Sequence, residues 1–284
     1  MTLPSLTFHA ARLFRAACKP RYAMGLAKLW LQNSGLRINQ EQSDTFRQLN
    51  LNRDKAVELA EDVCQKVLGK PYDEQDGMMS EHIVIFASLA AEKRPIKSIL
   101  EIGTFDGQTA LILATLFPDA KILTIDLQDD SNEFTNMYNR QDCSGQFTEQ
   151  RNKTLSKSPN IEFQDMNSLN LCRFDDARFD LVWVDGAHGY PVVAVDIANA
   201  LRLSGKNGLI LVDDVHTQLN NSDAIYSSTA AHEVLTEFRH VGLFSDVAYF
   251  RKRLNIRNNV PRKTEKFVAL AKPRVIHEAS HVSS

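Results

Sequence analysis

The sequence predicts an α/β protein: a doubly wound, mostly parallel sheet, with an antiparallel hairpin at its C-terminal end and helices before its first strand. Three observations predict this fold. From Ser98 onward, short apolar runs alternate with helix-like segments through five β-α units. Before residue 75, apolar residues recur at helical spacing and strand-like runs are few. Two late apolar runs follow each other with no helix between them, which is typical of antiparallel strands.

The apolar runs and the residues that interrupt them define the individual elements. The run 99–102 is apolar at nearly every position, which is typical of a strand buried on both faces. Three helix-like segments each end just before a proline, at positions 71, 95 and 118. Expected helices cover 54–68, 80–92, 107–117, 146–157, 191–203 and 230–240, and expected strands cover 99–102, 121–125, 161–163, 179–184, 209–212, 244–250 and 266–271. The long polar stretch 128–145 favours a lid or binding loop.

We expect three parts in the chain: an N-terminal helical extension (1–79), an α/β domain (80–272) and a flexible tail (273–284). The first forty residues contain six basic side chains and no acidic one. Three interpretations of this segment stay open. It is a cap helix on its own domain or on a second copy in a homodimer, an amphipathic helix that makes a peripheral contact with an anionic membrane, or a transit peptide.

Composition narrows the class of protein. The chain has 284 residues, of which 43% are hydrophobic, enough for a sizeable core and too many for a disordered chain. Its formal net charge of −2 gives no general attraction to nucleic acid, and we expect no nucleic-acid partner. The cysteines, Cys18, Cys64, Cys143 and Cys172, form no C-x-x-C pair. Reduced thiols and the lack of a long apolar run predict a cytoplasmic protein.

Acidic residues follow all five strands of the predicted parallel part. In a doubly wound sheet the ligand lies outside the carboxyl ends of the strands. Because those ends share one edge, we expect the acidic side chains to lie near one ligand. Turn chemistry explains a single such residue equally well, since Asp is common in turns and at helix starts. These acids are Glu101, Asp126, Asp165, Asp185 and the pair Asp213-Asp214.

The first of these strand ends carries a glycine turn, Glu101-Ile102-Gly103-Thr104-Phe105-Asp106-Gly107. Dinucleotide folds use G-x-G-x-x-G and bind a pyrophosphate on helix N–H groups. This turn begins with an acid instead, which favours a cationic or polyhydroxyl ligand. It resembles the first motif of class I S-adenosylmethionine-dependent methyltransferases, which have a Rossmann-like fold. The resemblance extends over residues 80–272.

The resemblance implies a binding site for S-adenosylmethionine. Asp126 matches the acid that holds the ribose hydroxyls, and a carboxylate can accept hydrogen bonds from both hydroxyls of a diol. Asp165 and Met166 match the position that contacts adenine. Asp185 would lie near the methyl donor. The glycine turn would surround the methionine part of the cofactor through Glu101, Gly103, Thr104, Phe105 and Gly107.

Two further segments suggest a subclass. Residues 179–190 (FDLVWVDGAHGY) and 211–214 (LVDD) are similar to segments of small-molecule methyltransferases, among them the catechol-type and macrocin-type O-methyltransferases. Acids at these positions hold Mg²⁺ there, so the resemblance implies Asp185, Asp213 and Asp214 as metal ligands. Carboxylates suit Mg²⁺, and a hydroxyl beside a dication loses its proton more easily. The acceptor would be a small-molecule hydroxyl. The alternative without metal, in which Asp214 caps the next segment, stays open.

Candidates for the catalytic group are Asp185 and two histidines, His188 and His216, which follow the fourth and fifth strands. A histidine titrates near neutral pH and can accept the acceptor's proton. Catechol-type enzymes carry a lysine near the position of His188, and this difference weakens the case for a catechol substrate. The basic residues of the terminal hairpin, which include Arg251 and Lys252, are interpreted as a solvated loop. Contact with a phosphorylated or carboxylated acceptor stays open as the alternative.

Three alternative functions remain. The first is a metal-independent N- or C-methyltransferase of the same fold. The second is a nicotinamide-dependent oxidoreductase with an atypical glycine turn, although the third glycine of that motif is missing. The third is a catalytically inactive binding protein associated with a membrane through the basic N-terminal segment.

Overall fold

A computed structural model gives the structure of the protein for residues 38–73, 81–136, 144–175, 178–219, 228–252, 256–257, 260–261 and 266–274, together with 20, 23–25 and 27. Most of the basic N-terminal segment and residues 275–284 of the predicted tail lie outside this described part. Within the described part, no helix combines the length and the apolar character needed to cross a membrane.

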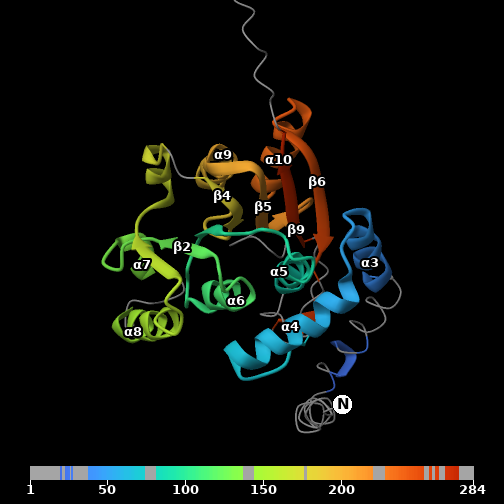
Figure 1. The fold of residues 1–284 in the computed structure, drawn as a ribbon, viewed down its shortest axis with the longest axis horizontal. Helices are drawn as coiled ribbons and strands as arrows, with labels where there is room; N and C mark the ends of the chain where they lie inside the picture. Colours follow the sequence, from blue (N-terminus) through green and yellow to red (C-terminus); the bar gives the residue numbers. More distant parts are fainter. Residues whose placement is uncertain are drawn as a thin grey trace, which may run out of the picture.

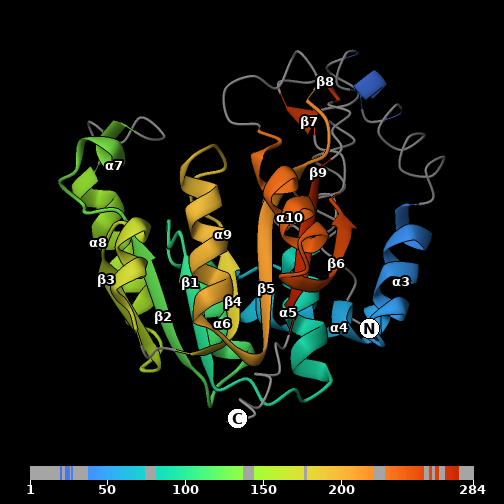
Figure 2. The same cartoon turned by 90° about the horizontal axis from the view of Figure 1, so that it is seen from above.

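A seven-stranded sheet forms the centre of the molecule, in the order β3-β2-β1-β4-β5-β9-β6 (Figures 1 and 2). The first five strands pair in parallel, and β9 pairs antiparallel with both β5 and β6. The predicted sheet with its antiparallel C-terminal hairpin is therefore confirmed. The strands are β1 (Ser98–Ile102), β2 (Lys121–Asp126), β3 (Ile161–Asp165), β4 (Phe179–Val184), β5 (Ser204–His216), β6 (Phe244–Arg251) and β9 (Lys266–Pro273).

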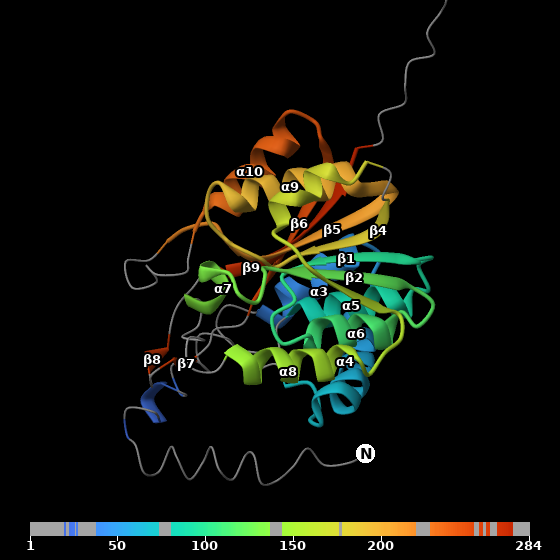
Figure 3. The same cartoon turned by 90° about the vertical axis from the view of Figure 1, so that its left-hand side faces the viewer.

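Helices cover both faces of the sheet (Figure 3). One face carries α4, α5, α6 and α8, and the other carries α9 and α10. Strand β1 is buried from Ile99 to Ile102, as expected for a strand between two helical layers. The helices are α3 (Ile38–Gln48), α4 (Arg53–Leu68), α5 (Glu81–Ala91), α6 (Gln108–Leu116), α7 (Asn132–Asn136), α8 (Ser144–Leu155), η2 (Ser168–Arg173), α9 (Val192–Leu203) and α10 (Ala230–His240).

Each face of the sheet has its own apolar core. On one face, Trp183 of β4 is fully buried and packs edge-on against Phe86 of α5. On the other face, Ile197 of α9 and Leu235 of α10 are fully buried against the opposite sides of the same strands. The two cores fix the strands from both sides, so the carboxyl ends of β1, β4 and β5 are held in constant relative positions.

The helices of the N-terminal extension are joined to the sheet by a buried polar network. Arg53 of α4 donates through Nε to Glu81 Oε1 at 2.9 Å, and Gln42 of α3 donates to Glu81 Oε2 at 2.8 Å. The same Gln42 amide donates to the carbonyl oxygen of Arg251, the last residue of β6, at 2.9 Å. The described part of the extension is thus tied to α5 and to the end of the hairpin.

Several segments depart from the predicted elements. The stretch 128–145, expected as a loop, contains α7, and the unpredicted η2 follows β3. The fifth strand was expected at 209–212, but β5 runs from Ser204 to His216, because its start pairs with β4 and its end pairs with β9. The basic connection between β6 and β9 contains a short ribbon of β7 (Ile256–Arg257) and β8 (Val260–Pro261). Pairing with a neighbouring strand extends β5 in a way that its local sequence pattern does not indicate.

Candidate active site

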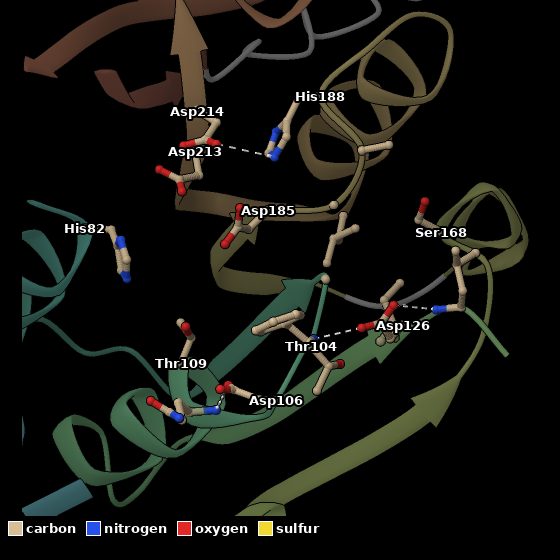
Figure 4. Close-up of a pocket in the computed structure, with 18 of the residues that line it drawn as sticks. His82, Thr104, Asp106, Thr109, Asp126, Ser168, Asp185, His188, Asp213 and Asp214 are labelled. Carbon is tan, nitrogen blue, oxygen red and sulfur yellow. Dashed lines mark hydrogen bonds and ion pairs between the residues drawn. The ribbon is translucent and has the colours of Figure 1, made fainter. Parts of the chain in front are cut away.

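A cavity of about 610 Å³ opens at the carboxyl ends of the parallel strands (Figure 4). This volume is typical of sites for small molecules and cofactors. Its walls come from the ends of β1, β2, β4 and β5, the segment after β3, α5, and the ends of β6 and β9. The cavity therefore lies at the edge of the sheet at which the sequence predicts a ligand.

The glycine turn after β1 forms the floor of the cavity. Gly103 has a φ of +102°, and a Cβ atom there would lie 2.2 Å from the carbonyl oxygen of Asp185. Gly107 has a φ of +77°, and its added Cβ would lie 2.8 Å from Leu155 Cδ2. Only glycine fits both places. Gly103, Thr104 and Phe105 line the cavity as predicted, whereas Gly107, the N-cap residue of α6, does not.

Asp126 lies at the end of β2 and reaches across to the glycine turn. Its Oδ2 accepts the backbone N–H of Phe105 at 2.8 Å, and its Oδ1 accepts that of Leu127 at 2.8 Å. A carboxylate offers about four lone-pair sites and can accept hydrogen bonds from more than one donor. Asp126 lines the cavity, as expected for a ligand-binding strand end.

Glu101 departs from the prediction, because it lies beneath the cavity wall and not on it. Its side chain is fully buried, and burial raises its pKa to about 8. Oε2 accepts the hydroxyl of Thr124 at 2.6 Å, and the hydroxyls of Thr124 and Thr104 lie 2.6 Å apart. Glu101 therefore reaches the cavity only through this chain of hydroxyls, at whose end Thr104 lines the wall.

Asp165 also departs from the prediction. It ends the edge strand β3, its side chain is exposed, and it does not line the cavity. Burial and the nearby Asp129 raise its pKa. Met166, Asn167 and Ser168, which follow it, do line the cavity. The wall predicted to contact adenine is therefore formed by the residues after Asp165, since an edge strand is one step farther from the site.

The acidic residues after β4 and β5 gather at one end of the cavity, where Asp185, Asp213 and Asp214 all line the wall (Figure 4). In a regular strand, consecutive side chains point to opposite faces. The ladder between β5 and β9 shifts register between Val212 and Val215, and Asp214 has a φ of +52°. This irregularity allows two consecutive aspartates to face the same cavity.

Two lysines from the hairpin pair with these carboxylates. The Lys252 ammonium contacts Asp213 Oδ1 and lies 2.6 Å from Asp214 Oδ1. The Lys266 ammonium lies 2.5 Å from Asp214 Oδ1. Both lysines line the cavity, and the Lys252 side chain is only 11% exposed. The interpretation of Lys252 as part of a solvated loop is therefore wrong.

The electrostatics of this end follow from burial and from the two lysines. Burial, followed by the charges of Asp213 and Asp214, raises the pKa of Asp185 well above its usual range. Burial would also raise the pKa of Asp214, but Lys252 and Lys266 outweigh it and hold that pKa well below the usual range. Burial opposes the charge of Lys252, yet Asp213 and Asp214 raise its pKa, so it remains an ammonium.

The predicted magnesium site does not fit this arrangement. Asp213 and Asp214 use carboxylate oxygens in ion pairs with lysines. Among the described residues, no group of three or more histidine, cysteine or acidic side chains is arranged to hold a metal ion. The carboxylates gather as expected, but the cations beside them are those of the chain itself.

The two predicted histidines have different places. His188 lines the cavity, and its Nε2 lies 3.7 Å from Asp214 Oδ2. Burial lowers its pKa, so its imidazole is neutral at pH 7 and can accept a proton. His216 is 4% exposed, pairs in register with Lys266 and does not line the cavity. The structure therefore gives no support to His216 as a base, and His188 remains the candidate.

Side chains of the cavity that were not predicted as site residues include His82, Lys252 and Lys266. His82 lies on α5, packs its ring 5.0 Å from that of Trp183 and points toward the cavity (Figure 4). Burial lowers its pKa to about 4, so it stays neutral. No local motif indicates it, because it lies in an apolar helix outside the β-α units. The lysines lie far along the chain from the aspartates, and only the hairpin brings them together.

Comparison with known families agrees with this fold and site. Residues 100–215 match the profile of a family described as a methyltransferase domain, Methyltransf_24. The matched segment runs from β1 into the end of β5 and includes Asp126, Asp185, Asp213 and Asp214. This part of the chain is therefore similar to a methyltransferase domain, which agrees with the predicted class. No curated protein matches the chain.

Solved structures with a similar arrangement include three methyltransferases. The O-methyltransferase TomG from Streptomyces achromogenes, in complex with S-adenosylmethionine, is 19% identical, with a TM-score of 0.46 over 81% of this chain and 94% of that one. An O-methyltransferase from Bacillus cereus is 15% identical, with a TM-score of 0.44 over 76% and 90%. MycE, from the mycinamycin biosynthetic pathway, is 14% identical, with a TM-score of 0.47 over 78% and 56%.

Proposed function

We propose that the protein is an S-adenosylmethionine-dependent methyltransferase that transfers a methyl group to a hydroxyl oxygen of a small molecule. One observation carries the proposal: the glycine turn, Asp126 and the Asp185–His188 loop line one continuous cavity in a segment that matches a methyltransferase family. The cavity thus offers a wall for a nucleoside at one end and a neutral histidine at the other.

The nucleoside end would be held by β2 and the segment after β3. Asp126 lines the cavity, its carboxylate is oriented by the backbone N–H groups of Phe105 and Leu127, and it would accept hydrogen bonds from the two ribose hydroxyls. Met166 and Asn167 would lie beside the adenine. Thr104, supported from below by Thr124 and Glu101, would accept a hydrogen bond from the ammonium of the methionine part. The start of α6 lines the same wall and would bind the carboxylate of that part.

The other end would carry the transfer. When bound, S-adenosylmethionine supplies a methyl group on a positively charged sulfur. The acceptor oxygen forms the new O–C bond as the C–S bond breaks, and the bonding electrons return to sulfur. The acceptor's hydroxyl proton passes to the imidazole of His188, which is neutral because burial lowers its pKa. The cavity walls would align the two reactants and exclude water.

Calorimetric titration with S-adenosylhomocysteine and with NAD⁺ tests the class of cofactor. We expect a saturable, micromolar interaction with S-adenosylhomocysteine and none with NAD⁺. Binding of NAD⁺ alone would replace the proposal with an oxidoreductase. Mass spectrometry of a hydroxylated-compound library incubated with the protein and S-adenosylmethionine then tests the acceptor atom, because an N- or C-methylated product would contradict oxygen as the acceptor.

A further inference from the structure

We propose that Lys252 and Lys266 occupy the place of a divalent cation between the acidic residues of the cavity, so that methyl transfer in this protein proceeds without a bound metal. The inference rests on the proposed function, and it assigns a role to two residues that no motif identifies. It concerns only the acceptor end of the cavity, formed by Asp185, Asp213, Asp214 and the two lysines.

The first argument is the use of the carboxylate oxygens. Lys252 bridges the two consecutive aspartates, and Lys266 adds a second ammonium on the oxygen of Asp214 that Lys252 also contacts. Magnesium demands short, nearly octahedral contacts to hard oxygen ligands. An Mg²⁺ ion between the same oxygens would have to displace both ammonium groups or lie beside them. Like charges at such a distance repel strongly where water is scarce.

The second argument is that the backbone holds the lysines in place. The N–H of Lys252 donates to the carbonyl oxygen of Lys266 at 2.8 Å, so the two residues are neighbours across β6 and β9. Arg251, the residue before Lys252, is fixed on both sides: its carbonyl accepts from Gln42, and its Nε lies 3.1 Å from Glu41 Oε1. Helix α3 of the extension therefore positions the strand end that presents Lys252.

The third argument is that the Lys252 ammonium can perform the electrostatic role of a metal ion. An ammonium has three N–H donors, and Asp213 and Asp214 account for two of those of Lys252. A further donor is available for an acceptor oxygen in the cavity that Lys252 lines. A fixed positive charge at that place stabilises developing negative charge on the acceptor oxygen, which is the electrostatic role of a metal ion. Lys252 would act as an acceptor-binding group and Lys266 as a positioning group.

Metal binding can be measured without knowing the acceptor. Electron paramagnetic resonance would follow the free Mn²⁺ signal as the full chain, saturated with S-adenosylhomocysteine, is added. The wild type is expected to bind no Mn²⁺ in a saturable way at millimolar concentrations. The double variant Lys252→Met, Lys266→Met uncovers the carboxylates and should gain one site. Lys272→Met, the same change at a position of β9 outside the cavity, should behave like the wild type.

Two results would overturn the inference. One is a wild-type protein that binds one Mn²⁺ and loses it in Asp213→Asn. The other is a folded double variant, checked by circular dichroism, that gains no site. If the double variant does not fold, the inference is tested by the wild-type titration and by Lys266→Met, since Lys266 is more exposed than Lys252 and its replacement disturbs the fold less. A wild type that binds one Mn²⁺, or a Lys266→Met variant that gains no site, would then overturn it. S-adenosylhomocysteine affinity is measured in the same samples, so loss of cofactor binding would contradict the proposed function separately from the metal result.

Discussion

At the scale of single residues, Asp126 and Asp165 show that an acidic residue at a strand end does not always reach the ligand site. They are partners in the register of β2 and β3, so they have the same place along their strands. Asp126 lines the cavity, and its carboxylate is oriented by two backbone N–H groups. Asp165 lies on the edge strand and is exposed. The sequence pattern identifies both as strand-end acids, but strand order decides which one can touch a ligand.

This contrast gives a matched pair of variants. Asp126→Ala removes a charged hydrogen-bond acceptor from the ribose, and such a bond contributes about 1.5–3 kcal/mol. Affinity for S-adenosylhomocysteine should therefore fall about 10- to 150-fold in calorimetry. Asp165→Ala should leave the affinity unchanged, because its side chain lies outside the cavity. Equal losses in both variants would show that the ribose is not held where we place it.

Glu101 makes stability depend on pH. Burial raises its pKa from 4.5 to about 8, so the folded state keeps a proton that the unfolded state releases between these values. The stability of the wild type therefore falls as pH rises from about 4.5 to 8. Glu101→Gln has no proton to release there, and it should be more stable relative to wild type at pH 8 than at pH 5.

Differential scanning fluorimetry at several pH values measures this effect. One pKa unit corresponds to about 1.4 kcal/mol, and about 1 kcal/mol shifts the melting temperature of a protein of this size by 2–4 °C. We expect a change of several degrees in the difference between the variant and the wild type. Glu162→Gln, the same change at an exposed position of β3, is the control. A difference that is the same at pH 5 and pH 8 would show that Glu101 ionises normally.

At the scale of elements, the glycine turn after β1 depends on close backbone approach. Gly103→Ala would place a Cβ 2.2 Å from the carbonyl oxygen of Asp185 and would force φ = +102° on an L-residue. Overpacking of this kind costs about 1–3 kcal/mol. We expect lower stability and loss of S-adenosylhomocysteine binding. Gly145→Ala, with open space around the added atom, is the control in the same calorimetric and thermal assays. A Gly103→Ala variant that binds normally would contradict the geometry of the turn.

The extension and the domain are coupled through Arg53 and Glu81. Both side chains are almost fully buried, and removing one partner of a buried ion pair costs about 3–5 kcal/mol. Arg53→Met should lose that much in urea unfolding. Arg47→Met breaks an exposed pair with Asp44 and should lose at most about 1 kcal/mol. Similar losses in both variants would mean that the network around Glu81 does not hold the extension to the domain.

The sequence predicts an element well where its local apolar pattern determines its ends. It predicts less where the structure depends on pairing between distant segments. The apolar runs place β1, β4 and α10 within a residue of their observed ends. The irregularity that turns both Asp213 and Asp214 toward the cavity depends on pairing with β9, more than fifty residues later. The same pairing brings in Lys266, and the pairing of β6 with β9 brings in Lys252; no local pattern assigns either charge to the site. The predicted metal ligands therefore gather as expected, but their partners could not be anticipated.

At the scale of the whole molecule, the strand order brings the candidate site residues together at the carboxyl ends of the central strands. Strands β1 and β4 lie at the centre, flanked by β2 on one side and β5 on the other, so their ends border one cavity. Strand β3 at one edge and β6 at the other are farther away, and only the segments that follow them reach the cavity. The fold class followed from β-α alternation, the helical N-terminal pattern and the two late apolar runs. Which residues belong to the site depended on the order of the strands.

A crystal structure of the protein with S-adenosylhomocysteine tests the central claim most directly. We predict that the ribose hydroxyls contact the Asp126 carboxylate, that the adenine lies beside Met166 and Asn167, and that the sulfur faces Asp185 and His188. Electron density for the ligand outside the cavity at the ends of β1, β2 and β4, or with its ribose turned away from Asp126, would contradict the account.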